Sequence, residues 1–219
     1  MKKEPVKPRV ISLVNLRGGA GRTTLAIAMA ACLAEVHRKR VLLLDFDPSG
    51  NASTQLKRFD ITQGASLTRR IVVSPCISFD LSTLAPLYIG RYDFVLIDNP
   101  ATLCPSLWNG LALSTHYLIP AIPEAAFVPE IVRLFRMVGY FSKRRDHEIK
   151  ALGIVVTHVR EGEMLEGFRR KLLFEEGVNP QKMPPLFKHF IHHIPNFSEN
   201  GLNSIDILKV IEEALQPLS

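Results

Sequence analysis

Residues 10–25 read VISLVNLRGGAGRTTL, and this stretch decides the class of fold. It begins with a mostly apolar run of the length of a buried strand, and from residue 23 onward it carries the apolar pattern of a helix. Glycines at 18, 19 and 21 allow the chain to turn tightly, so several backbone N–H groups can point at one anion. The N-terminus of the following helix adds its positive dipole at the same place. The stretch therefore predicts a phosphate-binding loop, and a glycine-rich turn without a ligand is the simpler alternative.

The rest of the chain alternates short apolar runs with helical patterns. Expected strands cover residues 9–16, 40–46, 78–85, 93–98, 116–122 and 151–159, with a weaker candidate at 187–193. Expected helices cover residues 23–36, 106–114, 129–143, 163–176 and 204–215. Several of the strands are apolar almost throughout, which is typical of strands buried on both faces of a parallel sheet. We therefore expect one α/β domain over residues 9–219, with a mostly parallel twisted sheet and helices on both faces, after a flexible basic tail at residues 1–8.

Composition narrows the possible classes of protein. Hydrophobic residues make up 47% of the 219 residues, so a packed globular protein is expected and extensive disorder is not. The three cysteines are scattered and odd in number, which argues against a disulfide framework and against a zinc site. No apolar run is long enough to cross a bilayer and no signal peptide is evident, so a cytoplasmic protein is expected. The net charge of +6 is only weak support for an acidic polymer as a partner.

Several segments, read in order, carry a family resemblance. RGGAGRTT at 17–24 resembles the deviant Walker A loop K-G-G-x-G-K-T-T of the ParA/MinD family of P-loop ATPases. VLLLDFDPSGNAST at 41–54 is similar to the family's switch I segment, and RYDFVLIDNPATL at 91–103 resembles its Walker B strand. The strand and helix of 112–134, the strand of 152–159 and a degraded late loop at 191–199 follow the same order. The resemblance covers residues 9–216 and is strongest to the ParA branch, which acts in plasmid and chromosome partition.

This resemblance implies a role for each residue of the loop and its neighbours. ATP would be bound by His158, close to the base, and by the loop residues Arg17, Gly18, Gly19, Ala20, Gly21, Arg22, Thr23 and Thr24. Mg²⁺ would be held by Thr23, Asp45 and Asp98, and Asp47 would position the attacking water. Arg17 occupies the position of the family's signature lysine, which reaches the phosphates of the partner subunit in a nucleotide-bridged homodimer. For both Asp45 and Asp47 a purely structural role in the turn before Gly50 is the alternative.

Arg22 is the main departure from the family pattern, because a lysine is usual at this position. A guanidinium is planar and wider than an ammonium, so it cannot take the same place between phosphates without a change in the loop. Weak binding, binding in an altered pose, and no binding remain open, and efficient hydrolysis is doubtful. Residues 51–93 also show one strand and little helical pattern where the family has a long helical segment. The guanine-reading N-K-x-D motif is absent, so adenine is the expected base.

The resemblance also implies partners. Members of the ParA branch bind DNA without sequence preference and respond to a ParB-like partner protein. The DNA-binding candidates here are Arg144, Arg145, Arg169, Arg170 and Lys171, although a solvated basic helix face is at least as good an explanation for either cluster. The C-terminal helix carries acidic residues, so the basic membrane helix of MinD-like relatives is not expected. Two alternatives remain: a pseudo-ATPase that keeps the fold as a regulatory or scaffolding module, and a small-molecule P-loop enzyme such as a biotin-pathway ligase relative.

Overall fold

The computed structural model describes residues 7–56, 71–75, 89–144, 148–162, 165–174, 179–193 and 205–218, with the backbone alone at 71–75 and at residue 180. Within these described residues, six parallel strands form one sheet in the order β3-β2-β4-β1-β5-β6. The strands are β1 (Arg9–Leu13), β2 (Val41–Asp45), β3 (Ile71–Pro75), β4 (Phe94–Asp98), β5 (His116–Ala121) and β6 (Lys150–Val156).

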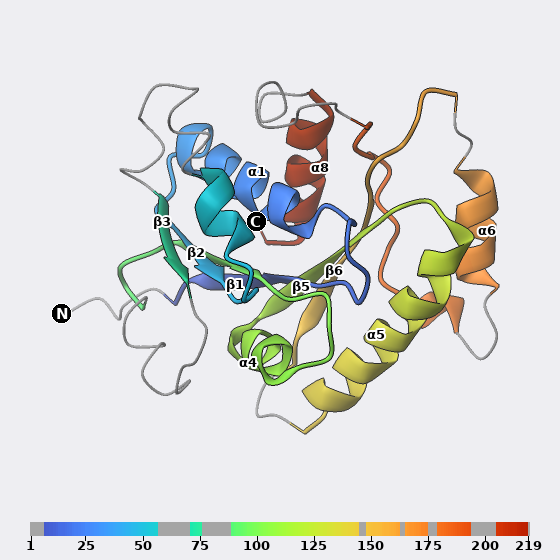
Figure 1. The fold of residues 1–219 in the computed structure, drawn as a ribbon, viewed down its shortest axis with the longest axis horizontal. Coiled ribbons are helices and arrows are strands. Elements are labelled where there is room, and N and C mark those ends of the chain that lie inside the picture. The colour runs from blue at the N-terminus through green and yellow to red at the C-terminus, as the bar shows by residue number, and fades with distance from the viewer. Residues whose placement is uncertain are drawn as a thin grey trace.

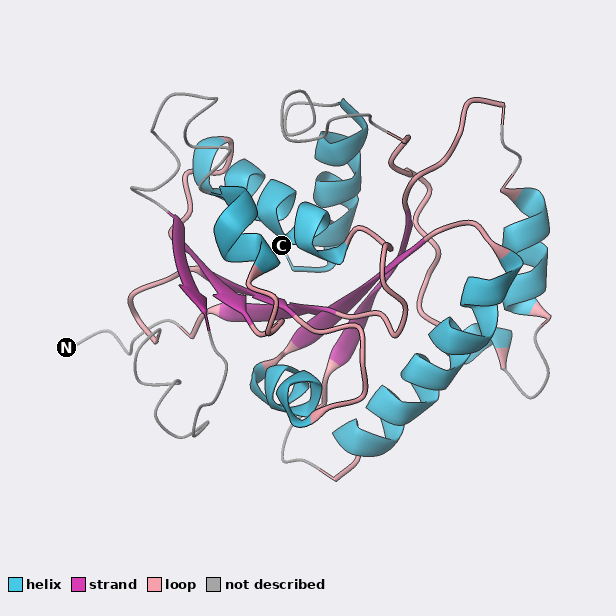
Figure 2. Cartoon of the chain, in the orientation of Figure 1, coloured by secondary structure: helices cyan, strands magenta, loops and turns pink. Residues whose placement is uncertain are grey.

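Helices cover both faces of this sheet, as the sequence predicts (Figure 1 and Figure 2). The helices are α1 (Arg22–Glu35), α4 (Pro105–Leu113), α5 (Val128–Ser142), α6 (Glu166–Leu173) and α8 (Ile205–Leu215). Short 3-10 turns form η2 (Ala125–Phe127), η3 (Pro180–Lys182) and η4 (Gln216–Leu218), and residues 51–56 are helical. Helices α1 and α8 lie on one face, α4 and α5 lie on the other, and α6 lies beside α5.

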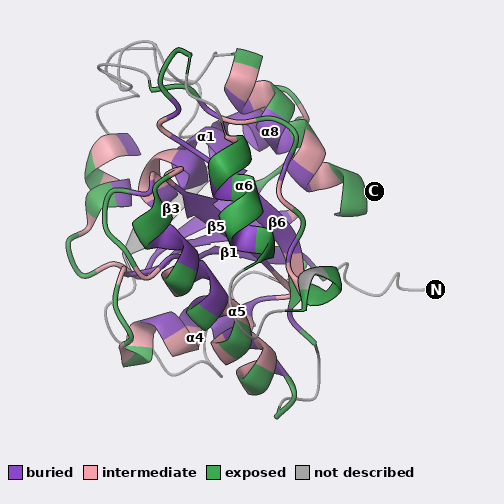
Figure 3. Ribbon diagram, turned by 90° about the vertical axis from the view of Figure 1, so that its right-hand side faces the viewer, coloured by how far each residue is buried: buried purple, intermediate pink, exposed green. Residues whose placement is uncertain are grey.

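The central strands are buried on both faces because successive side chains point to opposite sides of the sheet. In β2 and β4 every residue is buried, and in β1 only Arg9 is exposed. Ile11 and Leu43 pack with α1 and α8, whereas Leu42 and Ile97 belong to a cluster on the opposite face. Figure 3 shows the buried strands between helices whose outer sides are exposed. The predicted α/β class, with its parallel sheet, is therefore confirmed.

Two parts of the strand prediction differ from the structure. Residues 187–193 are not a strand; this segment makes only isolated bridges, Ile154↔Leu186 and Val159↔His192, next to β6. The strand β3 was not predicted, and it pairs in parallel with β2 at the edge of the sheet. The strand predicted at 78–85 and residues 1–6 of the predicted tail lie outside the described residues. The extent of the single domain over 9–219 stays a prediction.

Candidate nucleotide-binding site

The candidate site lies where β1, β2 and β4 end together. In the parallel register Leu13 of β1 and Asp45 of β2 both align with Asp98, the last residue of β4. The loop of residues 17–24 leaves β1 at this edge and leads into α1. Such an edge, formed by the carboxyl ends of parallel strands, is where ligands bind in open α/β sheets.

The glycines give the loop its shape. Gly19 has φ of 82° and Gly21 has φ of 76°, a left-handed conformation that glycine adopts without steric cost. A Cβ at Gly18 or Gly19 would meet no atom within 4 Å, so this part of the loop faces open space. The Asn15 side chain accepts a hydrogen bond from the Arg17 N–H at 2.7 Å, which fixes the start of the loop. The loop therefore has a defined turn with its outer side open to a ligand.

Two carboxylates and a hydroxyl face one another beside the loop. Thr23 Oγ1 donates a hydrogen bond of 2.7 Å to Asp98 Oδ2, and Ser53 donates to Asp45 Oδ2 from its N–H and its hydroxyl at 3.1 and 3.2 Å. The other oxygen of each aspartate, Oδ1, is buried and has no hydrogen-bond partner among the described residues. Buried polar atoms normally have partners, so these two oxygens are available to a ligand or to a water molecule.

The Asp98 carboxyl is strongly affected by its surroundings. Burial raises its pKa to about 7, and the negative charges of Asp45 and Asp47 act in the same direction. The hydrogen bond from Thr23 and the positive charge of Arg22 act in the opposite direction without cancelling the effect of burial. Asp98 therefore changes its charge near neutral pH, where a cation at this site would favour the ionised form.

Arg22, the residue in place of the usual lysine, points away from the loop toward the end of β4. The residue is 8% exposed, and its guanidinium donates a hydrogen bond from Nη1 to the carbonyl oxygen of Asn99. Burial lowers the pKa of Arg22, and attraction to Asp98 and Asp47 counteracts that effect. The side chain thus acts as an internal counter-charge for the carboxylates. It can contact a phosphate only if it gives up these contacts.

Arg17, at the position of the family's signature lysine, contacts residues of its own chain. Its Nη1 donates a hydrogen bond of 3.1 Å to the carbonyl of Ala126, and its guanidinium lies 5.0 Å from the ring centre of Phe127. The residue is exposed, and the contacts it makes are with η2. An exposed arginine held by one hydrogen bond and one cation–π contact is free to exchange them for a stronger anionic partner.

Asp47 lies near Arg22 of the loop, and His158 lies beside Gly21. The Asp47 carboxylate accepts hydrogen bonds from the N–H and hydroxyl of Ser49 at 3.0 and 2.7 Å, so it shapes the turn after β2. His158 lines a pocket of about 70 Å³ together with Gly21 and Thr24. Burial lowers the pKa of His158, and the neighbouring His193 adds to this shift. The pocket is smaller than the roughly 300 Å³ of ordinary ligand pockets, and a role for His158 beside a base stays a prediction.

This chain is similar in sequence to known nucleotide-binding proteins. The model of the CobQ/CobB/MinD/ParA nucleotide binding domain matches residues 11–204. The chain belongs to this family. The chromosome-partitioning ATPase Soj of Thermus thermophilus is 32% identical over 176 residues, which cover 69% of this chain and 70% of that protein. The maintenance of carboxysome distribution protein A of Gloeobacter kilaueensis is 32% identical over 209 residues, which cover 92% of this chain and 85% of that protein.

A solved structure agrees with the assignment to the CobQ/CobB/MinD/ParA family at the level of the fold. Cobyrinic acid a,c-diamide synthase from Mycobacterium smegmatis, with bound ADP and magnesium, superposes with a TM-score of 0.75 over 96% of this chain and 94% of that protein. The sequence identity is 19%, so the likeness concerns the fold alone. The resemblance to ParA/MinD ATPases that the motifs indicate is confirmed.

The residues of this family member fit a magnesium ion. Mg²⁺ prefers oxygen ligands, and the Thr23 hydroxyl with the unpartnered oxygens of Asp45 and Asp98 supplies them. Among the described residues, no group of three or more His, Cys, Asp or Glu side chains forms a metal cluster. The chain therefore offers part of a coordination shell, which suits an ion that also binds phosphate oxygens and water.

The basic residues proposed for DNA lie in two separate places. Arg169, Arg170 and Lys171 are exposed on α6, which lies beside the start of α5 (Figure 1 and Figure 3). Arg144 follows the other end of α5, near α4, where its guanidinium lies 4.0 Å from the ring centre of Tyr140. Arg145 lies outside the described residues. Among the helices that the structure describes, none has the length and apolar character needed to cross a membrane.

Sequence reasoning missed three residues that organise the site. Asn15 links the loop to the next strand, because its side chain also donates to the Pro120 carbonyl. The Asn99 side chain donates to the Leu13 carbonyl at 3.1 Å and so ties the end of β4 to β1. The Thr157 hydroxyl donates to the Ala20 carbonyl at 3.1 Å. All three are polar residues at the ends of apolar strand runs, which is the only signal that could have marked them.

Proposed function

We propose that this chain is a ParA-like, nucleotide-dependent dimeric switch that binds ATP with Mg²⁺ and hydrolyses it weakly. It acts in the cytoplasm in plasmid or chromosome partition, together with non-specific DNA and a ParB-like partner. The observation that carries the proposal is the meeting of the open glycine loop, the Thr23 hydroxyl and the unpartnered oxygens of Asp45 and Asp98 at one edge of the sheet. A triphosphate bound by backbone N–H groups and magnesium would complete this arrangement.

Arg22 is the reason to propose weak hydrolysis. Its guanidinium is buried against the Asn99 carbonyl, so binding of a triphosphate has to compete with contacts that already satisfy this cation. If Arg22 stays there, the loop binds phosphate through its backbone and lacks a side-chain cation on the terminal phosphate. Displacement of a reacting group by about an ångström is enough to reduce a rate by about a hundredfold.

Within the site each remaining side chain has a separate task. Magnesium, when bound, supplies charge neutralisation for the phosphates and the carboxylates. Asp47 lies close enough to influence Asp98 and Arg22, and we assign it the orientation of the attacking water. Arg17 would exchange the Ala126 carbonyl for the phosphates of a partner subunit, which couples nucleotide binding to dimerisation.

A part in partition is supported by the relatives and by surface charge. The name of the Thermus thermophilus relative states chromosome partitioning, and that protein matches over 69% of this chain. The exposed cations of α6 give a basic surface that can bind DNA phosphates. Because Arg144 lies at the far end of α5, we assign the main DNA contact to Arg169, Arg170 and Lys171.

A second function, a pseudo-ATPase that serves as a regulatory or scaffolding module, is favoured by one observation. Both arginines that replace the family's lysines make contacts within their own chain, Arg22 with Asn99 and Arg17 with Ala126. If these contacts persist in the presence of nucleotide, the fold remains while the reaction is lost.

Calorimetry with ATP and Mg²⁺ separates the two functions. We expect saturable binding, a shift toward dimer in light scattering, and slow turnover that increases in Arg22→Lys. Arg91→Lys, which changes an exposed arginine in the turn before β4, is the matched control and should leave turnover unchanged. Absence of binding at millimolar ATP in both the wild type and Arg22→Lys would establish the pseudo-ATPase instead.

The DNA contact is tested independently by retention of DNA at increasing salt. Arg169→Glu combined with Arg170→Glu should abolish retention, because the change reverses two charges in the α6 cluster. Lys209→Glu, on the exposed side of α8, is the control that should retain DNA. Equal retention by both variants would exclude α6 as the DNA-binding surface.

A further inference from the structure

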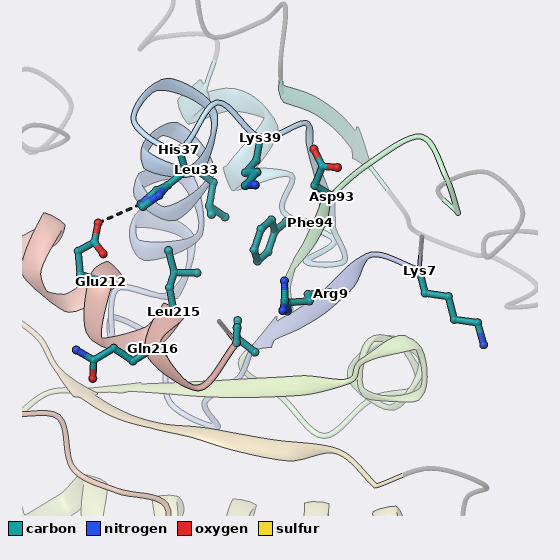
Figure 4. A pocket seen from close by; sticks show the side chains of 11 residues that line it. Lys7, Arg9, Leu33, His37, Lys39, Asp93, Phe94, Glu212, Leu215 and Gln216 are labelled. Atoms are coloured by element: carbon teal, nitrogen blue, oxygen red, sulfur yellow. Dashed lines mark ion pairs between the residues drawn. The ribbon is translucent and has the colours of Figure 1, made fainter. Parts of the chain in front are cut away.

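The edge of the sheet opposite the nucleotide loop contains a hollow that the proposed switch does not use. Its volume is about 720 Å³, within the range of roughly 300–1,000 Å³ that is typical of small-molecule sites. Four parts of the chain line it: the start of β1, the start of β4, the end of α1 with the following turn, and the end of α8 with η4. Figure 4 shows most of these side chains arranged around one open space, whereas Lys7 extends away from it. The hollow therefore depends on the fold and on no single segment.

The floor of the hollow is apolar. Leu33 of α1 and Phe94 of β4 are 1% and 5% exposed, and Leu215 of α8 packs against the same core. In Figure 4 the side chains of Leu33, Leu215 and Phe94 point toward the same space. This surface favours a ligand with an apolar body, because contact removes apolar area from water, chiefly at the half-buried Leu215.

The two acidic side chains of the wall are already engaged. Asp93 accepts hydrogen bonds from the backbone and side chain of Arg40, including one of 3.1 Å from Nη2 to Oδ1. Glu212 Oε1 lies 3.1 Å from Nε2 of His37, an ion-pair distance, although the geometry is not that of a hydrogen bond. The Asp93 charge is thus paired with Arg40, whereas the Glu212 charge is paired only when His37 is protonated.

The basic side chains of the wall that the structure describes form no close ion pair, although Lys39 is near enough to Asp93 to help lower the pKa of that carboxyl. Within the described part of the chain, no carboxylate lies within ion-pair distance of Lys7, Arg9 or Lys39, and all three are exposed. The Arg9 guanidinium lies 5.9 Å from the ring centre of Phe94, which holds a cation directly above the apolar floor. The wall therefore carries an excess of positive charge next to an apolar surface.

We infer that this hollow binds a small amphipathic anion, in which a carboxylate faces Arg9 and Lys39 and an apolar body contacts Leu33, Phe94 and Leu215. A guanidinium and an ammonium can both donate charge-assisted hydrogen bonds to one carboxylate. The inference is independent of the proposed ATP site, which lies at the other end of α1. Because Leu33 is near the end of that helix and Arg22 begins it, the two sites share one rigid element.

Octanoate is the probe for this site, with octylammonium and octan-1-ol as probes of matched length and different charge. Titration followed by calorimetry and by ¹H–¹⁵N spectra should show saturable octanoate binding with shifts at Leu33 and Phe94. Octylammonium should not bind, and octan-1-ol should bind about tenfold or more weakly, because it lacks the charge-assisted contacts.

Three variants test whether octanoate binds in this hollow. Arg9→Gln combined with Lys39→Gln should weaken octanoate about tenfold, because both charged donors to the carboxylate are lost. Lys150→Gln removes an exposed cation that begins β6 and does not line the hollow, so it should bind as the wild type does. Leu215→Phe, which enlarges a side chain of the floor, should also weaken binding while the protein keeps its melting temperature.

Three results would overturn the inference. These are absence of saturable binding at millimolar octanoate, equal affinity for octanoate and octan-1-ol, and displacement of octanoate by ATP with shifts confined to residues 17–24.

Discussion

Substitution of Asp98 by asparagine is expected to stabilise the protein at alkaline pH while it weakens magnesium and nucleotide binding. Asp98 is fully buried, and its pKa is raised from an ordinary value of 3.8 to about 7. A carboxyl whose folded-state pKa is raised binds its proton more tightly in the fold than in the unfolded chain. The stability that this proton supplies is complete below pH 3.8 and is lost as pH rises through about 7.

The magnitude follows from the two values. The separation between 3.8 and about 7 corresponds to about 4 kcal/mol of unfolding free energy at pH well above both. Between pH 5 and pH 8 the wild type should lose about 3 kcal/mol from this group, because part of the difference is already present at pH 5. Asparagine has no charge to lose and can still accept a hydrogen bond from Thr23. The stability of Asp98→Asn relative to the wild type should therefore rise by about 3 kcal/mol over the same range.

The assay is urea denaturation of wild type and variant at both pH values with a chelator present, so that no divalent ion contributes. The variant leaves Arg22 with less counter-charge, and this cost to its unfolding free energy is the same at both pH values. It therefore cancels when the stability difference at pH 5 is subtracted from that at pH 8. At pH 5 Asp98 is already neutral in the wild type. Asp93→Asn is the matched control at the other end of β4. The hydrogen bond from Arg40 holds the pKa of Asp93 below its ordinary value, so this variant should show no change between pH 5 and pH 8. A stability difference for Asp98→Asn that stays constant with pH would refute the reasoning.

Three further substitutions test the loop and the core. Gly21→Ala puts a side chain on a residue with φ of 76°, so urea denaturation should show a loss of about 1 to 2 kcal/mol together with weaker ATP binding; wild-type stability would contradict the left-handed turn. Asn15→Ala leaves the Arg17 N–H and the Pro120 carbonyl without a partner and should cost about 1 to 3 kcal/mol, with faster amide exchange at residue 17. Leu43→Ala opens a cavity in the fully buried core and should cost about 2 to 5 kcal/mol at an unchanged denaturant slope, and a changed slope would indicate altered compactness instead.

Long apolar runs made the central strands predictable. Residues 41–45 and 94–98 are buried on both faces in the structure, as their composition indicates. The boundaries were less predictable. The run beginning at residue 9 continues to 16, yet β1 ends at Leu13 because Asn15 turns its side chain to the loop and to Pro120.

The errors occurred where contacts between distant segments decide the conformation. The alternating pattern at 187–193 predicts a strand, but His189 and His192 pair with Glu213 and Asp206 of α8 at 2.9 and 2.7 Å. These pairs and the bridges to β6 hold the segment in an irregular path. The sequence pattern did not predict β3, because the strand conformation of this short run depends on pairing with β2. Such pairing is not visible in local sequence.

The local sequence pattern alone predicts the parallel α/β class, the order of its motifs and the glycine turn. Strands buried on both faces require runs of apolar residues, and backbone positions with positive φ favour glycine. The tertiary fold decided how the side chains meet. Alignment of Asp45 with Asp98 comes from the register of β2 and β4, and the burial of Arg22 against Asn99 comes from the approach of α1 to the end of β4. The hollow between Arg9, Phe94 and Leu215 joins residues from both ends of the chain. Long-range packing sets these placements, since residue type restricts what a side chain can contact but not which distant group reaches it.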